Sequence, residues 1–218
     1  MLVTVLAVPH LTVFNNRIRT ERLELRLPDL EQLDELATLA ARGIHPPETM
    51  PFGVPWTDLP PTELERGVVR FNLFQLGNWR QESWSFNPVV LLGGQVVGTQ
   101  GISAENFGVT RTFKTGSWLG QAHQRQGGGR EMRAAILHFG FVSLGARVAE
   151  SAAFRDNPAS IALSRSLGYQ ENGEFLVERR GLAAEQLGLR LTRERWEATA
   201  RSPVVVEGVE GCLELFGV

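Results

Sequence analysis

The stretch GSWLGQAHQRQGGGREMRAA, residues 116–135, decides the fold of this chain. Its first residues, Gly116–Leu119, are predicted to form a strand, and the loop that follows ends in Gly127, Gly128 and Gly129. A helical pattern begins directly after the glycines, with apolar residues at 3.6-residue spacing, namely Met132, Ala135, Ile136 and Phe139. Glycines let backbone N–H groups approach a ligand, and a helix N-terminus favours negative charge. We therefore expect a phosphate or pyrophosphate at this loop.

Two common phosphate-binding motifs do not fit these residues. A nucleoside-triphosphate loop needs Gly-Lys-Ser/Thr, and the only lysine of the chain, Lys114, precedes the glycines. A dinucleotide fingerprint needs G-x-G-x-x-G/A, but Met132 stands where the last small residue belongs. A nucleotide-binding domain is therefore the weakest of the functional hypotheses.

The signature Q/R-x-x-G-x-G/A does fit, as Gln124–Gly129. It resembles the acetyl-coenzyme A pyrophosphate loop of the GNAT superfamily of N-acetyltransferases. The segment TERLELR, residues 20–26, resembles the first strand of the ribosomal-protein N-terminal acetyltransferase branch of that superfamily. The segment NPASIALSRSLGY, residues 157–169, resembles the second GNAT motif, N-x-x-S … L-G-F/Y. The loop MPFGVPW, residues 50–56, is similar to one in actinobacterial members for which succinyl is a plausible acyl group.

The resemblance covers residues 18–200 and implies an α/β GNAT fold. We expect a mixed, twisted and partly splayed sheet flanked by helices, which opens between strands that end near Leu119 and Ala152. Residues 1–218 are interpreted as one domain with a C-terminal extension, 201–218, whose Val204–Val206 run suits an edge strand or a subunit contact. The other predicted elements are strands at 22–27, 84–92, 95–103, 147–152 and 186–191, and helices after Asp29, at Thr62 with Glu65 as a capping box, after Asn157, and from Thr192 through Ala200.

The composition gives no sign of nucleic-acid binding, a metal site, a disulfide framework or a membrane span. A net charge of −2 and a pI near 6.1 give no reason to expect nucleic acid. One cysteine and four scattered histidines form neither a disulfide framework nor a recognisable metal site, so no metal is expected. The apolar N-terminal segment is interrupted by Pro9 and His10 and is too short to span a bilayer. We expect a cytoplasmic protein without a membrane partner.

The resemblance assigns residues to the coenzyme. It implies that the pyrophosphate lies on the backbone of the loop, that the pantetheine arm follows the strand before it, and that a second helix faces the arm from the opposite wall. The residues in these roles are Gln124, Gln126, Gly127, Gly128, Gly129 and Arg130 for the loop, Trp118 and Leu119 for the strand, and Asn157 and Ser160 for the helix.

The catalytic residues follow from the same resemblance. Ser164 takes the place of the tyrosine that donates a proton in many relatives, and Lys114 stands where relatives often carry a glutamate base. Glu105, His123 and Glu150 are candidate bases by location only, and water is an alternative because binding can lower the pKa of an amine. Phe52 and Trp56 are candidate walls of the acceptor pocket, or else anchors that hold their loop to the core.

The leading hypothesis is therefore a coenzyme A-dependent N-acyltransferase that moves an acetyl or succinyl group to a primary amine by direct attack. The acceptor is a small molecule, a protein N-terminus or a lysine, and a homodimer or higher homo-oligomer is expected from the family. The alternative is a coenzyme A-binding sensor or interaction module with weak or absent catalysis. Lys114 and the missing tyrosine favour that alternative slightly.

Overall fold

The computed structural model describes residues 10–199 and 202–218. The strands are β1 (Arg17–Arg19), β2 (Leu23–Arg26), β3 (Ser83–Phe86), β4 (Val89–Leu92), β5 (Gln95–Glu105), β6 (Thr112–Leu119), β7 (Val148–Phe154), β8 (Gln170–Arg179), β9 (Leu182–Thr192) and β10 (Val205–Glu207). The helices are α1 (Leu30–Ala41), α2 (Pro61–Gly77), α3 (Phe107–Thr110), α4 (Gly128–His138), α5 (Pro158–Ser166) and α6 (Arg193–Glu197). A π-helical turn, Phe139–Ser143, continues α4. Short 3-10 helices lie at Thr12–Asn15, Trp56–Asp58, Gln121–His123 and Glu210–Phe216.

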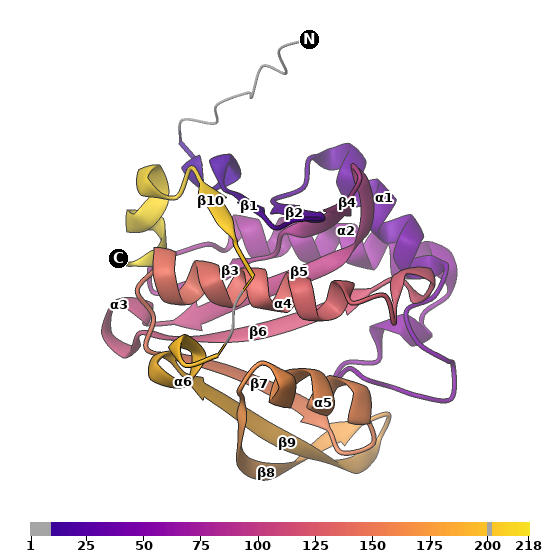
Figure 1. The fold of residues 1–218 in the computed structure, drawn as a ribbon. Helices are drawn as coiled ribbons and strands as arrows, with labels where there is room; N and C mark the ends of the chain where they lie inside the picture. The colour runs from indigo at the N-terminus through magenta and orange to yellow at the C-terminus, as the bar shows by residue number, and fades with distance from the viewer. Residues whose placement is uncertain (1–9, 200–201) are drawn as a thin grey trace.

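The strands form one mixed sheet in the order β10-β1-β2-β4-β5-β6-β7-β9-β8, and β3 pairs with β5 beside β4 (Figure 1). Among the described strands only the central neighbours β6 and β7 are parallel, and their register runs from Thr112 opposite Val148 to Lys114 opposite Glu150. Beyond this point β6 stays paired with β5 as far as Leu119, whereas β7 pairs only with β9. The sheet therefore splays between β6 and β7, which confirms the expected fold.

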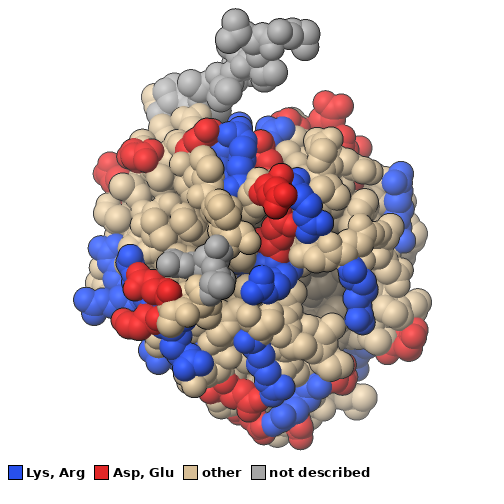
Figure 2. All heavy atoms as spheres, viewed as in Figure 1, with Lys and Arg blue, Asp and Glu red and all other residues tan. Residues whose placement is uncertain are grey.

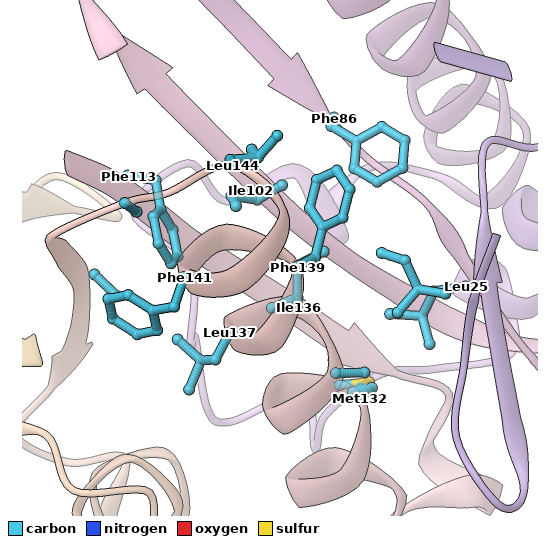
Figure 3. Close-up of a cluster of buried hydrophobic side chains, with 14 of the residues drawn as sticks. Leu25, Phe86, Ile102, Phe113, Met132, Ile136, Leu137, Phe139, Phe141 and Leu144 are labelled. Atoms are coloured by element: carbon cyan, nitrogen blue, oxygen red, sulfur yellow. The ribbon is translucent and has the colours of Figure 1, made fainter. Parts of the chain in front are cut away.

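Helices cover both faces of the sheet. Figure 1 shows α4 in front of β5 and β6, with α1 and α2 behind the sheet. The apolar stripe of α4 packs on the strands in the larger core cluster (Figure 3), which includes Leu25, Phe86, Ile102, Phe113, Met132, Ile136, Leu137, Phe139, Phe141 and Leu144. A smaller cluster between α1, α2 and the sheet includes Leu36, Leu64, Val68, Val89 and Leu91. Each helix buries one stripe, as the 3.6-residue spacing of its apolar residues predicts.

Two predicted element boundaries are wrong. The helix α2 begins at Pro61 after the N-cap Pro60, which makes no side-chain capping bond, so Thr62 lies inside the helix and does not cap it. Proline suits the first helical position because its fixed φ is helical and no N–H is needed there. The predicted strand 84–92 is divided at Asn87 and Pro88 into β3 and β4. Both parts still pair with β5.

The strand β8 was not predicted, and β9 is longer than predicted. Most residues of β8 are exposed. A strand in such a place needs no alternation of apolar and polar residues, and the sequence of β8 does not show the alternation that marks a half-buried strand. Thr192 does cap α6 by accepting a hydrogen bond from the Arg195 N–H, but the helix ends at Glu197. Ala200, the predicted end of this helix, lies outside the described residues.

The described part of the C-terminal extension, residues 202–218, completes the fold. The strand β10 pairs antiparallel with β1, so the edge-strand interpretation of this run is correct. Trp79 Nε1 donates to the Leu215 carbonyl at 2.8 Å, and Trp84 Nε1 donates to the Phe216 carbonyl at 3.1 Å. The ring of Phe216 is fully buried. The extension therefore belongs to the core.

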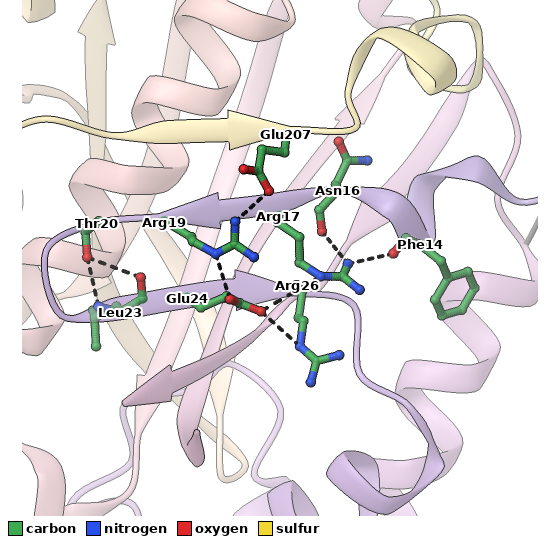
Figure 4. A network of polar contacts seen from close by, with 9 residues as sticks. All are labelled: Phe14, Asn16, Arg17, Arg19, Thr20, Leu23, Glu24, Arg26 and Glu207. Carbon is green, nitrogen blue, oxygen red and sulfur yellow. Dashed lines mark hydrogen bonds and ion pairs between the residues drawn. The ribbon is translucent and has the colours of Figure 1, made fainter. Parts of the chain in front are cut away.

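Ion pairs border the junction of β10, β1 and β2 (Figure 4). Glu24 accepts from Arg19 Nε at 2.9 Å and lies 3.2 Å from Arg26 Nε, while Arg19 also bonds to Glu207 on β10. These side chains are partly exposed, so each pair stabilises the fold by only about 0.2–1 kcal/mol.

Candidate active site

The glycine loop ends in a sharp turn at the start of α4. Gly127, the N-cap residue, has φ of 83°, a left-handed conformation that glycine adopts without a steric penalty. The N–H groups of Arg130 and Glu131 both donate to the Gly127 carbonyl, at 3.1 and 3.2 Å. The first free donors of the helix are therefore the N–H groups of Gly128 and Gly129, which lie before these bonds. N–H groups in this position are the kind that a phosphate can use, and the phosphate site at this loop stays a prediction.

The glutamines of the signature brace the loop. Gln124 Nε2 donates to the Ile44 carbonyl at 2.6 Å and to the Leu119 carbonyl at 2.8 Å, which ties the loop to the end of β6 and to the segment after α1. Gln126 Nε2 donates to the Ala122 carbonyl at 3.0 Å. Both side-chain amides are thus used inside the protein, and what the loop presents to a ligand is its backbone.

Glu131 is clamped to the start of β2, a contact that the sequence did not predict. Its Oε1 accepts from Thr20 Oγ1 at 2.6 Å and from the Arg22 N–H at 3.2 Å, and its Oε2 accepts from Arg22 Nε at 2.7 Å. Burial alone would raise the pKa of Glu131, but the bonds from Thr20 and Arg22 and the Arg22 charge outweigh it and hold that pKa below its ordinary value. The segment TERLELR therefore fixes the first turn of α4.

Three arginines surround the loop. Arg22 Nη1 donates to the Gln126 carbonyl at 3.2 Å, and a Cβ added to Gly127 would lie 3.3 Å from Arg22 Nη2. Arg125 and Arg130 are exposed on the loop and on the first turn of α4. On the face seen in Figure 2, side chains of both signs are interspersed, so the positive charge at the loop is a local feature. Such a cluster favours a phosphate group.

The second half of β6 has one open edge. The Gly120 N–H donates to the Val97 carbonyl, and every second residue of an antiparallel strand bonds to the same neighbour. By this alternation the backbone of Trp118 points to β5, while that of Ser117 and the N–H of Leu119 point to the splay. Among the described residues no strand pairs with this edge. Ser117 thus joins Leu119 as a candidate for the pantetheine arm, and the backbone of Trp118 does not face that side.

The opposite wall is the start of α5. Asn157 caps this helix, since its Oδ1 accepts from the Ser160 N–H at 3.1 Å. Leu163 on the same helix lies against the glycine loop, where a Cβ added to Gly129 would be 3.3 Å from its Cδ1. Ser164 is fully buried, and its hydroxyl has no hydrogen-bond partner among the described residues. An unpaired buried hydroxyl is costly in a finished core and is typical of a site that a ligand completes.

A buried arginine lies beneath the splay. Arg133 donates through Nε to Gln100 Oε1 at 3.3 Å and through Nη2 to Ser117 Oγ at 2.9 Å. No described carboxylate pairs with it, and Nη1 has no hydrogen-bond partner in the described part of the chain. Burial lowers the pKa of Arg133 and raises that of the neighbouring Tyr169 phenol, which lies 3.3 Å from Thr115 Oγ1.

The other face of β6 borders a cavity of about 560 Å³ between the sheet, α2 and the loop that carries Phe52 and Trp56. The rings of Phe52 and Trp56 are 5.1 Å apart, and those of Trp56 and Trp118 are 6.0 Å apart. The structure therefore brings both predicted acceptor residues to Trp118. Both also pack against the smaller core cluster, which agrees with the anchor interpretation, whereas their role as walls of an acceptor pocket stays a prediction.

Two arginines at the turn of the β8–β9 hairpin, Arg179 and Arg180, bond to the loop that carries Phe52 and Trp56. Arg180 bonds to both carboxylate oxygens of Asp58, and Arg179 bonds to Asp156 and, at 3.1 Å, to the Met50 carbonyl. The bonds from their arginines hold the pKa values of Asp58 and Asp156 below the ordinary range. The wall of the cavity is thus held by residues more than a hundred positions away.

The candidate bases are dispersed. Glu105 accepts from Ser83 Oγ at 2.8 Å and shares a separate groove with Lys114, outside the lining of the cavity. His123 lines a hollow beside α1, and Glu150 lies opposite Lys114 where β6 and β7 still pair. The structure does not bring Glu105 to Ser164, because Ser164 lies on α5 beside the splay while Glu105 lies on the α2 face of the sheet.

The part of the chain that the structure describes shows no group of three or more potential metal ligands. None of the described helices is long and apolar enough to cross a membrane.

Known proteins resemble this chain in sequence and in fold. Residues 22–170 match the family model of the acetyltransferase (GNAT) domain. Mycobacterium smegmatis RimJ, solved with a coenzyme A disulfide, has a TM-score of 0.66 at 16% identity, over 93% of this chain and 95% of that one. RimL, a ribosomal alpha-N-protein acetyltransferase solved with coenzyme A, has a TM-score of 0.60 at 16% identity, over 79% and 95%. A chimera of Vibrio cholerae spermidine N-acetyltransferase SpeG with hSSAT has a TM-score of 0.64 at 17% identity, over 82% and 100%. At these identities the structural likeness concerns the fold.

Proposed function

The chain belongs to the GNAT acetyltransferase family and is an acyl-coenzyme A-dependent N-acetyltransferase, and we propose that it acts by direct attack of a primary amine held in the cavity at Trp118. The donor lies on the splayed edge of β6, with its pyrophosphate on the N–H groups of Gly128 and Gly129. The acceptor enters from the opposite face of the sheet.

One observation carries this proposal. Residues 116–118 of β6 border the acceptor cavity, and the same stretch has an edge that no described strand covers and that leads straight into the glycine loop. A donor and an acceptor bound on the two sides of this strand would meet near Ser117, which lines the cavity and whose backbone points to the splay. The N–H groups of Ser117 and Leu119 on that edge would stabilise negative charge that develops on a carbonyl oxygen during attack.

Ser164 is the proposed source of a proton for the leaving sulfur. Its hydroxyl is buried on α5 and has no hydrogen-bond partner among the described residues, so in this proposal it donates directly or through a water. No carboxylate is placed as a base in this proposal, because neither Glu105 nor Glu150 lines the cavity.

Succinyl-coenzyme A is the second donor that we propose, beside acetyl-coenzyme A. The support is the buried Arg133 cation at the splay, because an arginine without an acidic partner suits a carboxylate at the end of an acyl chain.

The test is release of free thiol from acetyl- and succinyl-coenzyme A with a panel of amines and peptides. Turnover with either donor supports the proposal. Binding of coenzyme A in calorimetry without turnover across the panel would refute it and favour the binding-module alternative, which Lys114 at the usual base position also favours.

A homodimer is also proposed. Its support is a set of exposed apolar side chains on the β8–β9 hairpin, namely Phe175, Leu176 and Leu182. Light scattering measures the mass in solution, and a monomer at micromolar concentration would contradict this proposal.

A further inference from the structure

The acceptor cavity is lined without charge. Its walls are aromatic and aliphatic residues with a few neutral polar ones, and none of the described residues that line it is Asp, Glu, Lys, Arg or His. The neutral polar residues of the lining are Asn72, Gln75, Ser85, Asn87, Thr99, Ser103 and Ser117. Its volume of about 560 Å³ lies within the range of small-molecule sites, about 300–1,000 Å³.

An ammonium group meets no negatively charged side chain in the lining of such a cavity. Removal from water disfavours the charged form of an amine, and burial can lower its pKa by as much as about 3–5 units when no opposite charge is near. Only the neutral amine has the lone pair that attacks a carbonyl carbon. The cavity therefore shifts the bound acceptor toward its reactive form and releases the proton to solvent.

Charged groups around the cavity are few and compensated. The loop that carries Phe52 and Trp56 also carries two ionisable residues, Asp58 and His45. Asp58 is paired with Arg180, and His45 Nε2 lies 2.8 Å from Thr57 Oγ1. The adjoining groove along the sheet carries Arg80, Lys114 and Glu105, and Glu105 is bonded to Ser83. The groove, which shares Gln75, Ser85 and Ser103 with the cavity, is thus lined by two positive side chains and one negative one, and Glu150 lies opposite Lys114 in the sheet.

This distribution disfavours two kinds of acceptor. A polyamine whose second ammonium reached the groove would meet Arg80 and Lys114, which repel it, and one carboxylate, Glu105, that is already bonded to Ser83. A free amino acid would bury its carboxylate beside the reacting amine, where no described lining residue carries a positive charge. The aromatic wall of Phe52, Trp56 and Trp118 favours a flat or branched apolar body.

Resting on the proposed function, we infer that the acceptor is a primary monoamine with an uncharged aromatic or branched aliphatic body. The uncharged cavity lowers the pKa of its ammonium group and so replaces a general base. This accounts for Lys114 at the position where relatives often carry a glutamate, because no carboxylate is needed to take the proton.

The first experiment measures kcat/KM with acetyl-coenzyme A for 2-phenylethylamine, isoamylamine, spermidine, phenylalanine and a peptide with an N-terminal alanine. We expect both monoamines to exceed spermidine and phenylalanine by at least tenfold. Equal or better use of spermidine, of phenylalanine or of the peptide would overturn the inference. It would leave the proposed function intact, since thiol release with any amine supports that function.

The second experiment places a carboxylate in the cavity. Gln75 lies on α2, is partly exposed and borders both the cavity and the groove, so Gln75→Glu adds one charge at nearly constant shape. A nearby carboxylate raises the pKa of a bound amine by about 1–3 units. The pKa in the kcat–pH profile for 2-phenylethylamine should rise accordingly, and kcat at pH 7 should fall about tenfold for each unit.

Gln75→Met is the matched control, because it keeps the length of the side chain without the charge. Its kcat–pH profile should keep the wild-type pKa, whatever its KM. The inference fails if the two variants have the same profile, or if the wild-type pKa in kcat equals that of the free amine. Circular dichroism of both variants verifies that they are folded.

Discussion

Glu131→Gln tests whether the TERLELR segment holds α4, the helix of the proposed phosphate site, in place. The substitution keeps the size of the side chain but puts an amide NH₂ where Oε2 now accepts from the Arg22 guanidinium. Oε1 can still accept from Thr20 and from the Arg22 N–H. The change therefore removes the ionic part of the clamp and leaves its geometry nearly intact.

The expected loss of unfolding free energy depends on how far the two side chains are exposed to solvent. The Glu131 side chain is 16% exposed, but that of Arg22 is 46% exposed, so solvent screens the pair. A hydrogen bond to a charged group contributes about 1.5–3 kcal/mol, whereas an exposed ion pair contributes about 0.2–1 kcal/mol. Between these limits we expect a loss of about 1–2 kcal/mol. For a chain of this size that lowers Tm by roughly 2–8 °C.

The assay is thermal unfolding followed by tryptophan fluorescence from pH 7 to pH 3. The pKa of Glu131 is lower in the folded than in the unfolded protein, so its contribution is present above the unfolded pKa and lost as pH falls through the folded one. The Tm difference between wild type and variant should therefore close under acid conditions. Glu21→Gln, at an exposed neighbouring carboxylate, is the control and should leave Tm unchanged. Equal Tm values for Glu131→Gln and wild type at pH 7, or a difference that does not vary with pH, would refute the reasoning.

Three other substitutions give distinct expectations. Gly127→Asp should weaken coenzyme A binding at least tenfold in calorimetry, because its carboxylate repels the pyrophosphate and the φ of 83° suits glycine; unchanged affinity would show that the loop is misassigned. Ser164→Ala should lower turnover without lowering Tm or donor affinity, since it removes a buried hydroxyl that has no partner among the described residues; unchanged kcat removes Ser164 from the mechanism. Phe216→Ala should lower the free energy of unfolding by about 3–5 kcal/mol in urea titrations, and a loss under 1 kcal/mol would contradict the core role of the C-terminal segment.

Local features of the site were predictable because neighbouring residues determine them. The glycine turn depends on the φ of Gly127, and the start of α5 depends on the Asn157 side chain bonding three residues ahead. The apolar stripe of α4 is a repeat within one helix, and all four of its predicted members are buried. Interactions of this range leave a pattern in a short window of sequence.

The acceptor side was only half predictable. Phe52 and Trp56 stood out because large aromatic rings in a proline-rich loop need a partner, and they do meet Trp118. The latch that holds their loop, Arg180 with Asp58, spans 122 positions and has no local sequence signal. The predicted capping box at Thr62 was wrong because Pro61 starts the helix one residue earlier.

By itself, the sequence determined the strand, the glycine turn and the helix from Gly116 to Ala135, on which the proposed donor site rests. Only the tertiary structure decided that Glu131 bonds to Thr20 across 111 positions, that Arg133 turns inward beneath the splay, and that the acceptor cavity carries no charge. The physical reason is the distance along the sequence over which each kind of interaction acts. Backbone conformation and helix periodicity are set within a few residues, whereas burial of a charge and the lining of a cavity depend on which distant segments pack together.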